Sequence, residues 1–285
     1  MKMELGENRY GKARVRLLKV LRDAHAHQVF DWTVQVLVRG DFAATHTAGD
    51  NTGVLPTDTM KNTVYSLARK SAAGSMEEFA QELVDFLLER NRHLHSVEVE
   101  ILSDLWKRLS IAGEPHPTAF MHGSDERQTT RVTRAQSGAC SITSGFHNLV
   151  LLKTANSGFE GFLRDDLTTL PETADRLLGT AVRASWTYTA TVSAFDSLRG
   201  AIREAMLAAF AAHNSRSIQQ TLFAMGEAAL HACPEIDAID LTLPNRHALL
   251  VDLSRFGQDN PNQIFVPTEE PFGYIEARVQ RSQSV

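Results

Sequence analysis

The chain has 285 residues, and its 29 Lys and Arg against 34 Asp and Glu give a net charge of −5 at pH 7 with His neutral. This length, with 43% hydrophobic and 22% charged residues, is typical of one large or two ordinary globular domains, so disorder is not expected. The acidic balance excludes a nucleic-acid binder that relies on basic charge. No apolar run reaches the roughly 20 residues that a membrane-spanning helix needs. A disulfide or structural zinc scaffold is also excluded, because Cys140 and Cys233 lie in no CxxC or His-rich cluster.

The first half of the chain predicts strands on either side of helices. Residues 15–20 are expected to form a strand, and residues 32–38 and 97–102 alternate apolar and polar side chains. This period of two is typical of antiparallel strands with one wet face. Residues 57–63 are expected to open a helix, and residues 76–88 follow the i, i+3, i+4, i+7 spacing of an amphipathic helix.

The second half repeats these kinds of element. Residues 186–195 place hydroxyl groups on one side and apolar groups on the other, which predicts a strand. Residues 198–210 and, more loosely, 218–229 have helical spacing, with a break at 213–217. Residues 239–243 again alternate, which predicts a further strand.

The order strand, strand, helices, strand, strand therefore occurs twice, although the halves share no strong sequence identity. The division is expected near Ser137 and Gly138, which gives one module at residues 1–138 and another at residues 139–285. Each module would be a four-stranded antiparallel sheet with its helices on one face, an α+β fold. The threonine row of residues 187, 189 and 191 would leave a polar sheet face, which weakly favours oligomerisation.

Four short stretches contain residue types that packing alone does not explain. They are Arg9-Tyr10-Gly11-Lys12, residues 57–63 (Thr-Asp-Thr-Met-Lys-Asn-Thr), residues 156–176 (Asn-Ser-Gly-Phe, then Gly-Phe-Leu-Arg-Asp and Glu-Thr-Ala-Asp-Arg), and residues 243–247 (Leu-Pro-Asn-Arg-His) with Ser-Ile-Gln upstream at 217–219. In this order they resemble the motifs of urate oxidase (uricase), and they span nearly the whole chain. The resemblance implies the tunnelling fold: two tandem ββααββ modules in each chain, and a homotetramer that forms a barrel.

The resemblance also implies a substrate site for urate, a flat purine anion edged with carbonyls and ring nitrogens. Phe159 would stack on the purine, the Arg176 guanidinium would bind it bidentately, and the Gln219 amide would bind its opposite edge. Ile218 would contribute backbone contacts, and Asn245 would hold a small ligand by its amide. Without the resemblance, Phe159 would be an ordinary core residue and Gln219 a surface or capping residue beside Gln220. Arg176 would be the partner of Glu172 on a helix that Thr169 and Glu172 open with capping-box spacing.

Turnover would need a proton relay, for which Lys12, Thr57 and His247 are the candidates. A lysine of lowered pKa can take a proton through a hydroxyl, and His has the side chain whose ordinary pKa is nearest neutrality. The implied reaction converts urate, O₂ and water into 5-hydroxyisourate and hydrogen peroxide with no cofactor and no metal, and Thr57 and Asp58 would reach the substrate from a neighbouring subunit. The local alternative is that Thr57 and Asp58 only cap a helix.

Two other functions stay open at this point. One is another tunnelling-fold enzyme for purines or pterins, such as a cyclohydrolase, which would need a metal or a catalytic cysteine. The other is a non-catalytic purine-binding relative, which would be expected to lack Lys12, Thr57 or His247. The N-terminus has no apolar secretory segment and the chain ends in Arg-Ser-Gln-Ser-Val without a Ser-Lys-Leu-type peroxisomal signal, so a cytoplasmic location, in a bacterial cell, is expected.

Overall fold

The computed structural model describes residues 3–189, 191–268 and 270–282. The chain divides into two compact units, one of residues 1–145 with 191–196 and one of residues 146–190 with 197–285. Each unit contains antiparallel strands and helices, so the expected α+β class is confirmed. None of the described helices is long and apolar enough to cross a membrane.

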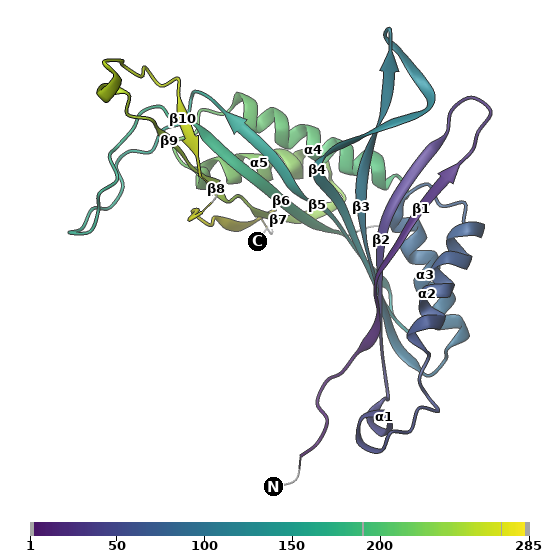
Figure 1. Ribbon diagram of the computed structural model, residues 1–285. Helices are drawn as coiled ribbons and strands as arrows, with labels where there is room; N and C mark the ends of the chain where they lie inside the picture. Colours follow the sequence, from purple (N-terminus) through teal and green to yellow (C-terminus); the bar gives the residue numbers. More distant parts are fainter. Residues whose placement is uncertain (1–2, 190, 269, 283–285) are drawn as a thin grey trace. The chain divides into compact units, whose positions relative to one another are not determined.

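The first unit has four long strands and three helices (Figure 1). They are β1 (Tyr10–Leu21), β2 (Gln28–Gly40), α1 (Ala43–Ala48), α2 (Thr57–Lys70), α3 (Met76–Arg90), β3 (Leu94–Ile111) and β4 (Glu114–Ala135). Strands β1 to β4 lie in chain order, each antiparallel to the next. Helices α2 and α3 cover one face of this sheet, so the element order expected for residues 15–102 is confirmed.

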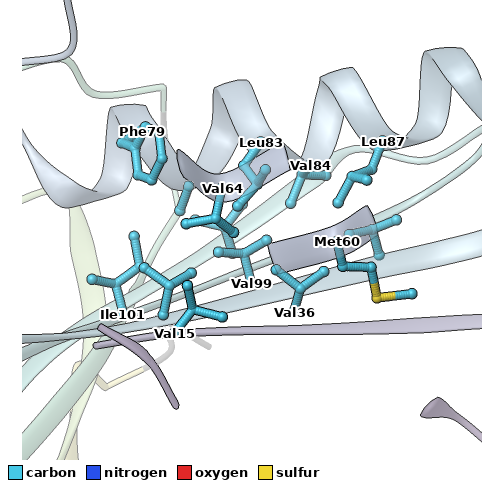
Figure 2. Packing of buried hydrophobic residues seen from close by; sticks show 14 of the residues in the cluster. Val15, Val36, Met60, Val64, Phe79, Leu83, Val84, Leu87, Val99 and Ile101 are labelled. Atoms are coloured by element: carbon cyan, nitrogen blue, oxygen red, sulfur yellow. The ribbon is translucent and has the colours of Figure 1, made fainter. Parts of the chain in front are cut away.

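The core of the first unit lies between the sheet and these two helices. Figure 2 shows Met60 and Val64 of α2 and Phe79 of α3 directed toward the strand valines. All of these side chains are fully buried, and burial of each stabilises the fold by about 1.5–3 kcal/mol. Helix α3 starts at a capping box in which Ser75 accepts from the Glu78 amide and Glu78 accepts from the Ser75 amide.

A β-bulge in β1 decides which face of the sheet carries Lys12. Lys12 pairs with Val36 of β2, and the next paired residue, Val15, faces Val34, so β1 has two residues here where β2 has one. Arg14, inside the bulge, has a φ of 57°. Residues three apart on a regular strand lie on opposite faces, whereas the extra residue brings Lys12 to the helix-covered face that Val15 and its partners share.

The second unit has a sheet in the order β5-β6-β7-β11 and two long helices. Its elements are β5 (Cys140–Lys153), within which the division between units falls, β6 (Leu178–Tyr188), α4 (Phe195–Ala212), α5 (Ile218–Ala232), β7 (Ile236–Thr242), β8 (Asn245–Arg246), β9 (Ala248–Leu250), η1 (Ser254–Phe256), β10 (Phe265–Pro267) and β11 (Glu276–Gln280). Strand β6 is antiparallel to β7 and also pairs with the short β8, while β9 pairs with β10. Both expected helices, the break between them and the expected strand at 239–243 are confirmed.

The strand expected at residues 186–195 is only partly correct. Strand β6 starts earlier, at Leu178, and ends at Tyr188, where the Thr189 amide and hydroxyl both donate to the Glu235 carbonyl. Phe195 instead begins α4. The β-branched residues of this stretch favour a strand, but the chain leaves the sheet at Thr189.

Candidate active site

Three extended segments of the second unit are joined side by side around residues 156–159. On one side, the Gly158 amide donates to the Ser215 carbonyl over 2.8 Å, and the Ser215 amide donates to Asn156 over 3.0 Å. On the other side, Phe159 exchanges two backbone hydrogen bonds with Thr173, of 2.7 and 3.1 Å. Residues 156–159 thus link the segment before Arg176 to the segment before α5.

Gly158 is required by this close packing. A Cβ atom at this position would lie 2.8 Å from the Ala174 carbonyl oxygen and 3.0 Å from that of Thr173, closer than side chains approach backbone. Asn156 has a φ of 59°, a left-handed conformation that Asn tolerates better than most residues. The Asn-Ser-Gly-Phe order therefore has a local structural reason, which is to carry Phe159 between two neighbouring segments.

Four of the expected site residues meet in one pocket of the second unit. The pocket has a volume of about 420 Å³, within the range of small-molecule sites, and its lining includes Phe159, Arg176, Asn245 and His247. Its walls are mostly apolar and come from residues 170–177, β9 and β10 (Leu170, Pro171, Leu177, Ala248, Leu249, Leu250 and Phe265), with Thr154, Thr173, Asp175 and Asn262 as further polar groups. A planar ring, a cation, an amide and an imidazole therefore face one cavity.

Among these groups, Arg176 has a buried nitrogen without a hydrogen-bond partner in the described part of the chain. Its guanidinium carbon lies 5.3 Å from the centre of the Phe159 ring, and its Nε is buried with no hydrogen-bond partner among the described residues. Burial lowers the pKa of this guanidinium below its usual value, because removal from water disfavours the charged form. An anion entering the pocket would supply the missing partner.

The helix-surface alternative for Arg176 is wrong. Residues 169–176 form no helix, and Thr173 pairs with Phe159 instead. Glu172 accepts from the Gly161 amide over 3.3 Å and lies 3.7 Å from Arg164. The capping-box spacing of Thr169 and Glu172 therefore reflects a loop contact.

Asn245 and His247 reach the pocket through the pairing of β8 with β6. Asn245 faces Thr180, and Arg246 faces Gly179, so the antiparallel register carries the following residue, His247, toward the start of β6. His247 and Arg176 line the same pocket. The backbone N–H of Asn245 donates to the Gly273 carbonyl over 2.7 Å. The His247 carbonyl accepts from Thr268, whereas its ring forms no hydrogen bond within the described residues.

Ile218 and Gln219 occupy the first positions of α5 and do not line this pocket. Ser217 caps the helix by accepting from the Gln220 amide, and the Gln220 side chain accepts from the Arg216 amide. The Gln219 side chain therefore has no capping role, and its exposed amide is free of hydrogen bonds within the described chain. Ile218 is 3% exposed, so its side chain belongs to the core and only its backbone can face a ligand.

Lys12, Thr57 and Asp58 lie in the first unit. Pro56, not Thr57, occupies the N-cap of α2, and no side chain caps this helix, so the capping alternative is wrong for both residues. The Thr57 hydroxyl has no hydrogen bond among the described residues, whereas the Asp58 carboxylate binds Lys61 and Asn62. The Lys61 hydrogen bond is the largest cause of a lowered Asp58 pKa, and the charge of Lys12 adds to it.

Gly11 fixes the backbone that carries Lys12. A Cβ atom at Gly11 would lie 1.8 Å from the Val36 carbonyl oxygen, so no other residue fits without moving β1 away from β2. The glycine of the Tyr-Gly-Lys motif therefore allows the close strand approach that precedes the bulge.

The pocket also contains residues that sequence reasoning missed. Leu170, Asn262 and Phe265 line it, although none has a chemical function visible in the sequence. Leu170 is 50% exposed and ends a Thr-Thr-Leu stretch close to Glu172. Its closeness to that motif residue was the signal in the sequence that could have pointed to it. Asn262 comes from the loop after η1 and Phe265 from the start of β10, where no motif indicated a site.

Comparisons with known proteins find relatives that match nearly the whole chain. The family described as Uricase matches residues 8–133 and 142–276. The chain is 42% identical over 283 residues to the uricase of Arthrobacter globiformis, covering 99% of this chain and 92% of that protein, and 38% identical to the uricase of Dictyostelium discoideum, covering 98% of each. The crystal structure of the Arthrobacter globiformis uricase superposes with a TM-score of 0.93, covering 100% of this chain and 97% of that one.

Proposed function

The chain belongs to the uricase family and is a urate oxidase of purine degradation, and we propose that it binds urate in the pocket of the second unit that Phe159 and Arg176 line. The observation that carries the proposal is the pocket in which the half-buried Arg176 guanidinium, whose Nε has no hydrogen-bond partner among the described residues, lies against the Phe159 ring. These groups match a flat anion in shape and in charge.

In the proposed complex, urate stacks on Phe159 and its carbonyl and adjacent ring nitrogen meet the Arg176 fork. Gln219, which has a free amide at the start of α5, binds the opposite edge, and the Ile218 backbone supports it. Asn245 holds O₂ or water over the ring. The hydrogen bonds between residues 156–159 and Ser215 support this reading, because they tie the Phe159 segment to the segment that leads into α5.

The proposed chemistry draws its two electrons from urate itself. Urate, O₂ and water give 5-hydroxyisourate and hydrogen peroxide, so the protein must remove protons from the purine and pass protons to reduced oxygen. Redox enzymes usually rely on a cofactor for such chemistry; here the deprotonated purine is the reductant, and the proposal includes no cofactor or metal.

Lys12, Thr57 and His247 form the proposed proton relay. The Thr57 hydroxyl has no competing partner among the described residues, and the bulge places Lys12 on the face of β1 that α2 covers. The link between Lys12 and the start of α2 is supported by the effect of the Lys12 charge on Asp58. His247 would carry protons onward from the pocket.

Asp58 contributes through its backbone in this proposal. Its carboxylate is occupied by Lys61 and Asn62, but the first backbone hydrogen bond of α2 joins the Met60 amide to Pro56. The amides of residues 57–59 thus have no partner in the helix and can donate to an anion at its N-terminus.

We further propose that the two half-sites meet between copies of the chain. The resemblance to uricases implies tandem ββααββ modules and a homotetrameric barrel in which Thr57 and Asp58 serve the pocket of a neighbouring subunit. Supporting this, the first unit carries Lys12 and Thr57, and the second carries Phe159, Arg176 and His247. A monomer would then have incomplete sites.

Separate measurements of binding and turnover test these roles. Urate binding is measured by calorimetry without oxygen, and kcat is measured in air. Lys12→Ala and Thr57→Ala should lower kcat strongly and leave anaerobic binding within a few-fold of the parent, because these groups act on protons. Arg176→Ala should weaken anaerobic binding about ten- to a hundredfold, the range of a charged hydrogen bond. Equal losses of binding in all three variants would contradict the division of roles.

A further inference from the structure

A second aromatic ring lies against Phe159. The ring centres of Phe159 and Phe162 are 4.9 Å apart, and their planes are inclined by only 12°. This is an offset stack, one of the geometries that aromatic pairs prefer. One face of Phe159 is therefore covered by another ring of the same chain.

Each of the two rings also lies near a guanidinium group. The Arg176 carbon is 5.3 Å from the centre of Phe159, and the Arg164 carbon is 5.1 Å from the centre of Phe162. Cations are attracted to aromatic faces at such distances. Arg164, Phe162, Phe159 and Arg176 thus form a series of contacts that ends at the pocket.

The loop that carries Phe162 is closed by Glu172. Its carboxylate accepts from the Gly161 amide, next to Phe162, and lies 3.7 Å from Arg164. One residue later, Thr173 forms its two backbone hydrogen bonds with Phe159. Both ends of the loop are therefore fastened beside the stacked rings, which limits the tilt that either ring can adopt.

Phe162 does not belong to the lining of the pocket, whereas Phe159 does. We propose that Phe162 is a positioning residue that supports Phe159 from the face that the substrate does not use, and so sets the plane on which the purine stacks. This inference rests on the proposed role of Phe159 as the stacking residue. A ring supported on one face presents its other face at a fixed tilt to the Arg176 fork, which binds in a plane.

The test is urate affinity without oxygen in variants that differ in the ring at position 162. Phe162→Leu keeps an apolar side chain and removes the ring, so Kd for urate should rise roughly two- to tenfold, the range of an aromatic stack. Phe162→Tyr keeps the ring and should bind urate as the parent does. Leu163→Ala, in the same loop at a side chain that is 93% exposed, is the matched control and should change nothing. If Phe162→Leu does not fold, Phe162→Met takes its place.

A double-mutant cycle shows whether Phe162 acts through Phe159. Phe162→Leu should cause no further rise in Kd when Phe159 is already Leu, and an equal rise in that background would overturn the inference. An unchanged Kd in Phe162→Leu, with a raised Kd in Phe159→Leu, would overturn it while leaving the proposed site intact. An unchanged Kd in Phe159→Leu would instead refute the stacking role of Phe159, and the inference with it.

Discussion

The binding role proposed for Arg176 would come at a cost to the stability of the free protein. Its guanidinium is half-buried, its Nε has no partner among the described residues, and burial lowers its pKa. A charge in that position destabilises the fold until an anion pairs with it. Removing it should therefore weaken binding without weakening the fold.

Arg176→Met is the variant that tests this cost. The free energy of unfolding without urate should be unchanged or higher than that of the parent, because an uncompensated charge is replaced by an apolar chain. Anaerobic urate at a hundred times Kd should stabilise the parent by about 2.7 kcal/mol and the variant much less. Thermal unfolding with and without urate measures both effects. A clear loss of stability in the urate-free variant would mean that Arg176 has a structural partner.

Cys233 predicts a loss of stability at high pH. Its thiol donates to the Glu235 carboxylate over 3.3 Å, and burial, followed by this hydrogen bond, raises its pKa from 9.0 to about 11. The unfolded chain would ionise the thiol first, so its contribution is complete below pH 9 and is lost as the pH rises toward 11. Free energies of unfolding at pH 8 and pH 10.5 should therefore differ less in Cys233→Ala than in the parent. An equal pH dependence of the free energy of unfolding in the two proteins would contradict the raised pKa of Cys233.

At the residue scale, chemistry was predictable from the sequence and local geometry was not. The resemblance to uricases, and not residue type alone, placed Phe159, Arg176, Asn245 and His247 in one site, and the pocket contains all four. The spacing of Glu172 suggested a helix because capping is a local pattern, but pairing of Thr173 with Phe159 prevailed. Leu170 and its apolar neighbours were missed because a pocket wall has no distinctive residue type.

At the scale of elements, the bulge in β1 sets the sheet face on which Lys12, the lysine of the proposed relay, lies. Strand, helix and strand were all predictable from periodicity. The face that Lys12 occupies was not, because it depends on one extra residue between Lys12 and Val15. Bulges leave no reliable sequence signal, and each one reverses the alternation on which predictions of strand faces depend.

Two glycine substitutions test this element. Gly11→Ala would bring a Cβ atom to 1.8 Å from the Val36 carbonyl oxygen, so β1 must shift and we expect a loss of about 2 kcal/mol or more, with a fall in kcat as Lys12 moves. The matched control, Gly200→Ala, has open space around its Cβ atom in α4 and should stabilise the protein by about 0.5–1 kcal/mol. Chemical denaturation and steady-state kinetics measure both. Parent-like behaviour of Gly11→Ala would show that the close strand approach is not needed.

At the scale of the whole molecule, the proposed function requires two halves from different copies of the chain. The sequence predicted the α+β class from the order of its elements, and relatives of known structure support the fold over the full chain. Assembly is beyond what periodicity can predict, because an interface uses the same residue types as any other surface. It must be tested directly.

Complementation between inactive variants is that test. Lys12→Ala removes a group of one half-site and Arg176→Ala a group of the other. In mixed oligomers from co-expression, random assembly should join two intact halves in about a quarter of the sites. The mixed protein should therefore regain about a quarter of the parental activity per site. Separately purified variants, mixed without reassembly, are the control. No recovery in verified mixed oligomers would place each site within a single chain.

In the proposed mechanism, a clamped, deprotonated purine supplies the electrons, and the protein only binds it and moves its protons. The most direct measurement is turnover by protein that has been dialysed against chelator and checked for metals by elemental analysis and for flavin or haem by absorbance. Urate loss should be undiminished, with equimolar formation of peroxide. Activity that disappears with a stoichiometric metal or organic cofactor, and returns when that group is added back, would contradict it.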